Sequence, residues 1–143
     1  MKKSLNIIVL LLIVLSLTGC GSKTLTCTRK SEEAIYTLEE KIVSKYSFSD
    51  LKKFKIHQEM ELKNNSFVNA ELLKQTVDIQ FINLKENGAN VNVKSKGNKI
   101  IVDVNADISK ISKSKLKKIK LYNINESLED AKKSFKKSGY TCK

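Results

Sequence analysis

The chain has 143 residues and a net charge of +12, and its length fits one domain with a modest hydrophobic core. Proline and tryptophan are absent and glycine occurs only five times, which excludes a Pro-rich spacer between domains. The positive charge is concentrated in residues 108–143, which contain eleven lysines and only three acidic residues.

The first nineteen residues have the three parts of an export signal. Lys2 and Lys3 give it a positive start, and residues 5–17 form a nearly unbroken apolar run, which is shorter than the ~20 residues that span a bilayer. The tetrad Leu-Thr-Gly-Cys that follows resembles the lipobox of bacterial lipoproteins. That resemblance implies cleavage between Gly19 and Cys20 and a palmitate-type lipid on Cys20. The alternative is an ordinary secretory signal followed by a chance cysteine.

After the signal peptide (1–19), residues 20–30 are expected to be the lipid anchor and a short tether, and residues 31–143 the single domain. Cys27 and Cys142 remain as an even pair in an oxidising compartment, which favours a disulfide between them. Closing so long a loop is worth about 4–5 kcal/mol on the chain-entropy model. Two free thiols or a redox-active pair remain as alternatives, although the chain has no Cys-x-x-Cys motif.

The first half of the domain is expected to begin with a β-hairpin. Residues 35–48 fit either a helix or a strand, but Ser49-Asp50 forms a turn signal, and residues 51–63 then alternate, with Phe54, Ile56, Met60 and Leu62 on one face. Residues 67–85 then repeat apolar side chains at three- and four-residue steps, which predicts one long amphipathic helix that starts at Asn64-Asn65-Ser66 and ends at Asn87-Gly88. Three further apolar residues widen its stripe: Leu72, Ile79 and Ile82.

The second half is expected to contain another hairpin and two helices. Residues 91–104 alternate around a Gly97-Asn98 turn, and residues 108–122 have a weak helical pattern. Residues 125–138 predict a final helix, with Ser127 and Asp130 as a capping box and Gly139 as its end. The element order ββαββαα predicts a two-layer α+β domain with an antiparallel sheet and helices packed on one face.

Several sequence elements together resemble a group of small lipoproteins of Gram-positive type, the YehR-like lipoproteins. The elements are the Leu-Thr-Gly-Cys-Gly start, Leu25-Thr26-Cys27-Thr28, the Lys-Gly-Asn-Lys turn with Val-Asp-Val and Ala106-Asp107, and the ending Gly139-Tyr140-Thr141-Cys142. The resemblance covers nearly the whole chain. It implies an extracytoplasmic lipoprotein on the cell membrane, and it transfers no catalytic residue.

Candidate catalytic and metal-binding residues are few. His57, the only histidine, shares the polar side of its strand with Glu59 and Glu61, which predicts either a weak metal patch or an ordinary solvated face. A Cys27 nucleophile with His57 as its base is a remote alternative. Calcium-loop, phosphate-loop and nucleophile-elbow motifs are absent, so neither an enzyme nor a cofactor is expected.

The lysines of the C-terminal quarter are the strongest candidates for a binding surface. They would contact anionic lipid or a phosphate-rich cell-wall polymer, whereas dipole complementarity and solubility are the alternative explanations. Nucleic acid is not expected, because export removes the chain from the cytoplasm. We therefore expect a non-catalytic binding module, with a small enzyme, a thiol-redox accessory protein or an envelope component as alternatives. The expected contact residues are Lys115, Lys117, Lys118, Lys132, Lys133, Lys136 and Lys137.

Overall fold

The computed structural model describes residues 21–64, 67–118 and 127–143. Their elements, in chain order, are β1 (Lys23–Glu32), β2 (Tyr36–Ser47), β3 (Asp50–Leu62), α2 (Ala70–Gln80), α3 (Ile82–Glu86), β4 (Asn90–Lys96), β5 (Lys99–Asp107), the 3-10 turn η1 (Ile108–Lys110), α4 (Lys113–Lys118), α5 (Leu128–Lys137) and β6 (Thr141–Cys142). Within these described ranges, no helix is long and apolar enough to cross a membrane. The predicted signal peptide and Cys20 lie outside them.

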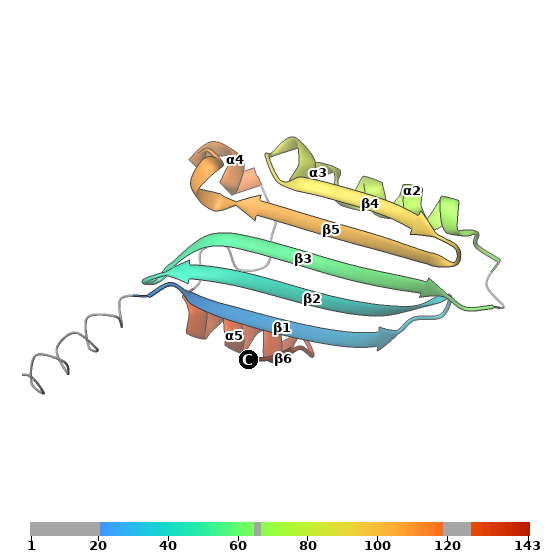
Figure 1. Cartoon of the computed structure of the whole chain (residues 1–143), viewed down its shortest axis with the longest axis horizontal. Helices are drawn as coiled ribbons and strands as arrows, with labels where there is room; N and C mark the ends of the chain where they lie inside the picture. Colours follow the sequence, from blue (N-terminus) through green and yellow to red (C-terminus); the bar gives the residue numbers. More distant parts are fainter. Residues whose placement is uncertain (1–20, 65–66, 119–126) are drawn as a thin grey trace, which may run out of the picture.

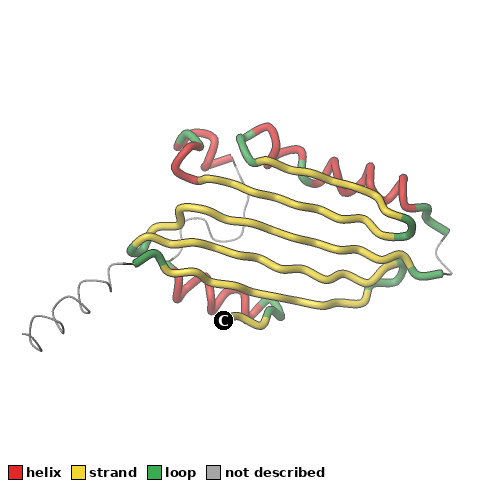
Figure 2. Tube along the Cα trace, viewed as in Figure 1, coloured by secondary structure: helices red, strands yellow, loops and turns green. Residues whose placement is uncertain are grey.

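The six strands form one antiparallel sheet in the order β4-β5-β3-β2-β1-β6 (Figure 2). Both predicted hairpins are present, and β3 pairs with β5 although α2, α3 and β4 intervene in the sequence. The fold is therefore α+β. The predicted order ββαββαα is wrong, because one strand precedes the first hairpin and a short one follows the last helix.

The additional first strand corrects the assignment of residues 20–30 to a tether. β1 pairs with β2 along its whole length, from Lys23 opposite Tyr46 to Glu32 opposite Thr37. Only Leu25 and Cys27 of this strand are fully buried. So short an apolar alternation does not predict a strand by itself. The segment is a strand because its backbone groups form hydrogen bonds with β2.

The predicted long helix is shorter and interrupted. Asn69, not residues 64–66, caps α2, since its side chain accepts a hydrogen bond from the Leu72 backbone NH at 2.8 Å. The helix breaks at Phe81, before α3 begins. Its buried residues are Leu73, Val77 and Leu84, whereas Leu72, Ile79 and Ile82 are 54 %, 68 % and 50 % exposed. The apolar stripe that packs on the sheet is therefore narrower than predicted.

The C-terminal segment closes the other edge of the sheet. The Ser127 hydroxyl accepts a hydrogen bond from the Asp130 backbone NH at 3.3 Å at the start of α5, and Ala131 and Phe135 are buried. Gly139 has φ +84°, a conformation that suits glycine at a helix end. β6 then pairs with β1 and places Cys142 opposite Cys27, and a disulfide joins the two. Of the predicted helix 108–122, η1 and α4 lie within the described residues.

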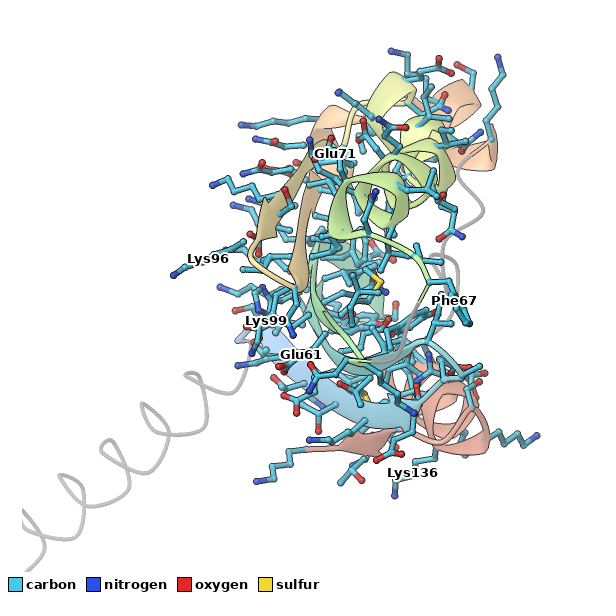
Figure 3. All side chains as sticks on the ribbon, turned by 90° about the vertical axis from the view of Figure 1, so that its right-hand side faces the viewer. Glu61, Phe67, Glu71, Lys96, Lys99 and Lys136 are labelled. Atoms are coloured by element: carbon cyan, nitrogen blue, oxygen red, sulfur yellow. A yellow bond between two sulfur atoms is a disulfide. The ribbon has the colours of Figure 1, made fainter. Side chains whose placement is uncertain are left out.

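The two faces of the sheet differ in composition. The inner face carries the hydrophobic core, with side chains such as Ile42, Ile100 and Val102 almost fully buried. In Figure 3 the helices lie on one side of the curved sheet, and Lys96 and Lys99 lie on the opposite side. Because side chains alternate along a strand, this outer face takes most of the polar strand residues, with Glu40 and Ser44 of β2 as buried exceptions.

Candidate anionic-surface site

Four lysines from three elements meet on the outer face near the turn between β2 and β3. We call Lys45, Lys53, Lys55 and Lys110 the lysine end. Lys45 lies directly opposite Lys53 across the two strands, and Lys55 follows on the same side of β3. Together with Asn90, Asn105 and other neighbours they line a hollow of about 440 Å³. Amide and ammonium groups around one hollow are donors for an anionic oxygen ligand.

Acidic groups neutralise only part of this charge. Asp107 lies 3.8 Å from the Lys53 ammonium and 3.9 Å from that of Lys110. The hydrogen bond from the Ser109 hydroxyl (2.6 Å), followed by the two lysines, lowers the pKa of Asp107, so this residue remains an anion. Among the described residues no acidic oxygen lies within 4 Å of Lys45 or Lys55.

The chain enters the sheet at the same end. Lys23, the first residue of β1, lies opposite Tyr46, one position from Lys45. Figure 1 shows the start of β1, the β2–β3 turn and α4 together at the left end of the molecule. α4 adds the exposed lysines Lys113, Lys115 and Lys118. The first residues of the described chain and the lysines of α4 therefore lie at the same end of the sheet as the lysine end.

The lysines predicted from the C-terminal quarter do not form one surface. Lys115 and Lys118 lie on α4, near the lysine end, while the side chain of Lys117 lies outside the described part. α5 lies beside β1 and β6, at the other edge of the sheet (Figure 1). It carries the remaining four predicted residues: Lys132, Lys133, Lys136 and Lys137.

The prediction missed the lysines of β2 and β3, which are dispersed in the sequence and do not form a run. Two signals could have placed these lysines on one face: the alternation in residues 51–63 and the pairing of the first hairpin. A lysine search along the sequence alone therefore finds α4 and α5 but not the strand residues.

At the opposite end of the outer face, three lysines have acidic partners, whereas Lys96, which lies opposite Lys99, has no acidic oxygen within 4 Å among the described residues. Lys30 contacts Glu39 at 2.6 Å, Lys99 contacts Glu61 at 3.3 Å, and Lys63 contacts Glu32 at 3.8 Å. We call these three pairs the paired end. The hydrogen bond between Lys30 and Glu39 raises the pKa of the lysine and lowers that of the glutamate.

His57 lies on the outer face between the two ends. Its Nδ1 is 2.7 Å from an Asp103 oxygen, and its Nε2 is 3.3 Å from Glu59. The hydrogen bond with Asp103 is the main cause that raises the pKa of His57. Glu61, predicted to share this patch, is paired with Lys99 instead. Within the described residues, no group of three or more His, Cys, Asp or Glu side chains could hold a metal ion.

The structure separates Cys27 from His57, so the remote nucleophile–base pair is wrong. Cys27 is fully buried in the core and forms the disulfide. Ile56, which precedes His57, is also buried, so the histidine points to the opposite side of the sheet.

A buried polar cluster on the inner face had no sequence signal. Glu40 is 3 % exposed and accepts hydrogen bonds from the Tyr140 hydroxyl and the Gln58 amide. The Arg29 guanidinium lies 4.6 Å from the Tyr140 ring centre and donates to the Ser138 carbonyl at 3.4 Å. These contacts attach the segment after α5 to β1, β2 and β3, so the cluster serves the packing of the C-terminal edge.

Comparison with known proteins supports this class of fold. No protein-family model matches the sequence, and no curated protein matches it. The fold and the polar outer face define an α+β domain built on an open antiparallel sheet. The NMR structure of the E. coli YehR protein is similar, with a TM-score of 0.56 and 18 % sequence identity over 85 % of this chain and 92 % of that one. At this identity the likeness shows a YehR-like fold alone.

Proposed function

We propose that this chain is an extracytoplasmic lipoprotein held to the cell membrane by lipid on Cys20, and that it acts as a non-catalytic binding module. In this proposal the domain has two layers, with helices over the inner face of the sheet and an open outer face. The lysine end contacts an anionic surface. The observation that carries the proposal is the entry of the chain at Lys23, beside Lys45, which has no acidic oxygen within 4 Å in the described part of the chain.

The distance between anchor and domain supports this arrangement. Two residues, Gly21 and Ser22, lie between Cys20 and Lys23, and an extended chain spans about 10 Å from the first to the last of these four residues. The Debye length at physiological ionic strength is about 8 Å. This is close to the span of the link, so an anionic membrane surface attracts the lysines at the start of the sheet. Each lysine near an anionic lipid surface contributes about 1 kcal/mol to binding.

The chemistry of the described residues supports a binding role over catalysis. Cys27 is fully buried in a disulfide, and His57 is engaged with two carboxylates on the outer face. A nucleophile needs a base within hydrogen-bond reach, and these two residues lie on opposite sides of the sheet. The lysine end, in contrast, offers several donors around one hollow.

Lipid attachment is tested on the full-length chain expressed in a bacterium. We expect mass spectrometry to find a mature N-terminus at Cys20 that carries the mass of a diacylglyceryl group, and the Cys20→Ser variant to lack it. A mature chain that retains residues 1–19, or an unmodified Cys20, would contradict the lipoprotein proposal.

Surface binding is tested separately on residues 21–143, without lipid. We expect retention on vesicles rich in anionic lipid or on cell-wall fragments, weaker retention on zwitterionic vesicles, and release as salt screens the lysines. Equal retention on both kinds of vesicle, unaffected by salt, would reject the anionic-surface part of the proposal and leave the lipid anchor standing.

A further inference from the structure

The turn between β2 and β3 exposes an aromatic residue in an unusual conformation. Phe48 and Ser49 form the two-residue connection, and the Phe48 side chain is 78 % exposed. Its φ is +56°, in the left-handed region, where turns normally use glycine, asparagine or aspartate. A bulky residue with positive φ is strained, and neither burial nor turn geometry favours phenylalanine at this position.

The surroundings of Phe48 are basic and close to the chain entry. Lys45 and Lys53 lie opposite each other just before and after the turn. Tyr46, two residues before Phe48, is opposite Lys23, the first residue of β1. Figure 1 shows this turn beside the start of β1, at the left end of the molecule. An exposed aromatic ring, a cluster of lysines and the N-terminal attachment thus share one end.

We propose that Phe48 is a second membrane contact, inserted into the outer leaflet beside the lipid on Cys20. This inference rests on the proposed lipid anchor. The bilayer is the occupant because the short link holds the turn near the surface, and because aromatic and basic side chains together match the interface between acyl chains and anionic headgroups. The ring enters the apolar boundary while the lysines remain at the headgroups.

Insertion at this turn would determine the orientation of the domain relative to the membrane. β2 and β3 have 12 and 13 residues, so at a rise of roughly 3.3 Å per residue the paired end lies about 40 Å from the turn. The strands would then rise from the surface, and the outer face would stay open along its length. A lipid anchor alone would leave the domain free to tumble about the link.

A matched control residue is available at the other end. Phe67 is fully exposed, as Phe48 nearly is, but it follows β3 and lies at the end of the molecule that faces the viewer in Figure 3. The chain has no tryptophan. Phe48→Trp and Phe67→Trp therefore each introduce a single tryptophan, one at each end.

The experiment uses each full-length variant, purified after bacterial processing and reconstituted into vesicles that contain anionic lipid and brominated acyl chains. We expect the Phe48→Trp variant to show blue-shifted emission, to lose most of its fluorescence to the brominated lipid and to resist aqueous acrylamide. The Phe67→Trp variant should show the opposite pattern. Circular dichroism checks that both variants are folded.

Three results would overturn the inference. Equal lipid quenching of the two variants would mean that the β2–β3 turn does not enter the bilayer. Protection of the Phe48→Trp fluorophore from acrylamide without lipid quenching would mean that protein, a second copy included, covers it. Failure of the protein to float with vesicles would overturn the lipid anchor itself, and flotation without quenching would overturn only the Phe48 contact.

Discussion

The lysine end and the paired end of the outer face are built from the same residue type on the same sheet, yet their charges are arranged differently. At the paired end, Lys30, Lys63 and Lys99 each contact a glutamate. At the lysine end, Lys53 and Lys110 share Asp107, and Lys45 lies opposite another lysine. The described part of the lysine end therefore has one carboxylate within 4 Å of its four lysines, whereas each of the three lysines that define the paired end has a glutamate.

In the proposed function, this difference assigns the contact with an anionic partner to the lysine end. Exposed ion pairs add little stability, but they cancel the field that a lysine would otherwise project. Like charges directly opposite on neighbouring strands destabilise a sheet, so the Lys45–Lys53 pair opposes folding until an anion lies between or over it. The lysine end lowers the stability of the isolated domain and lies beside the first strand. Such a surface is suited to an external anionic partner.

The largest expected effect is the loss of stability when the disulfide is removed. It tests whether the lysine end and the paired end unfold as one cooperative unit. Replacing Cys27 and Cys142 together by alanine removes a bridge across 115 residues of sequence and should lower the free energy of unfolding by about 4–5 kcal/mol. Chemical denaturation measures the loss, and hydrogen exchange should show reduced protection at both ends. Reduction of the unmodified protein is the control. Exchange that rises only in β6 and α5 would show that this edge opens locally and that the bridge does not stabilise the two ends.

The next effect tests the comparison directly through membrane binding. Lys45→Gln, Lys53→Gln and Lys55→Gln combined should weaken partitioning of residues 21–143 to anionic vesicles by about a hundredfold, since each lysine contributes about 1 kcal/mol near the surface. Lys30→Gln, Lys63→Gln and Lys99→Gln remove the same charge from the paired end and should have a much smaller effect. Equal losses in vesicle sedimentation would mean that only net charge matters.

A smaller effect should have opposite signs at the two ends. Lys45→Gln removes a like-charge cross-strand contact and should raise the free energy of unfolding by a few tenths of a kcal/mol. Lys63→Gln removes a partly exposed ion pair with Glu32 and should lower that free energy by a similar amount. Urea denaturation at low salt measures both, and high salt should reduce the two differences. Destabilisation by both variants would contradict the assigned pairing.

The smallest effect concerns His57, between the two ends. Its pKa in the folded protein is raised above 6.5, chiefly by the hydrogen bond with Asp103. The protonated histidine therefore stabilises the fold below pH 6.5, and this contribution is lost as the pH rises through the folded pKa. NMR titration of the only histidine should show Asp103→Asn lowering its pKa more than Glu59→Gln does. The reverse order would mean that Glu59 is its main partner.

Much of the local structure was predictable because local signals determine it. The Gly97-Asn98 turn, the alternation of residues 51–63 and the Ser127 cap each depend on residues within a few positions of one another. The placement of His57 and Glu59 on one polar side was likewise predicted from period-two alternation. The disulfide pairing followed from counting cysteines.

The rest depended on contacts that are distant in sequence. β1 is a strand because β2 and β6 flank it, and α2 exposes Leu72 and Ile79 because it packs on the sheet by a narrow stripe. Glu40 meets Tyr140 only after the C-terminal edge closes. None of these partners lies within the window that a periodicity search covers.

The sequence by itself predicted an export-type N-terminus. It also determined the composition of the strands and the excess of lysine. Only the tertiary structure decided which lysines share a surface. Strand pairing joined Lys45 to Lys53, the 3-10 turn after β5 added Lys110, and the position of β1 placed them beside the chain entry. The physical reason is that charge along a chain is local, whereas the field at a surface depends on which strands become neighbours.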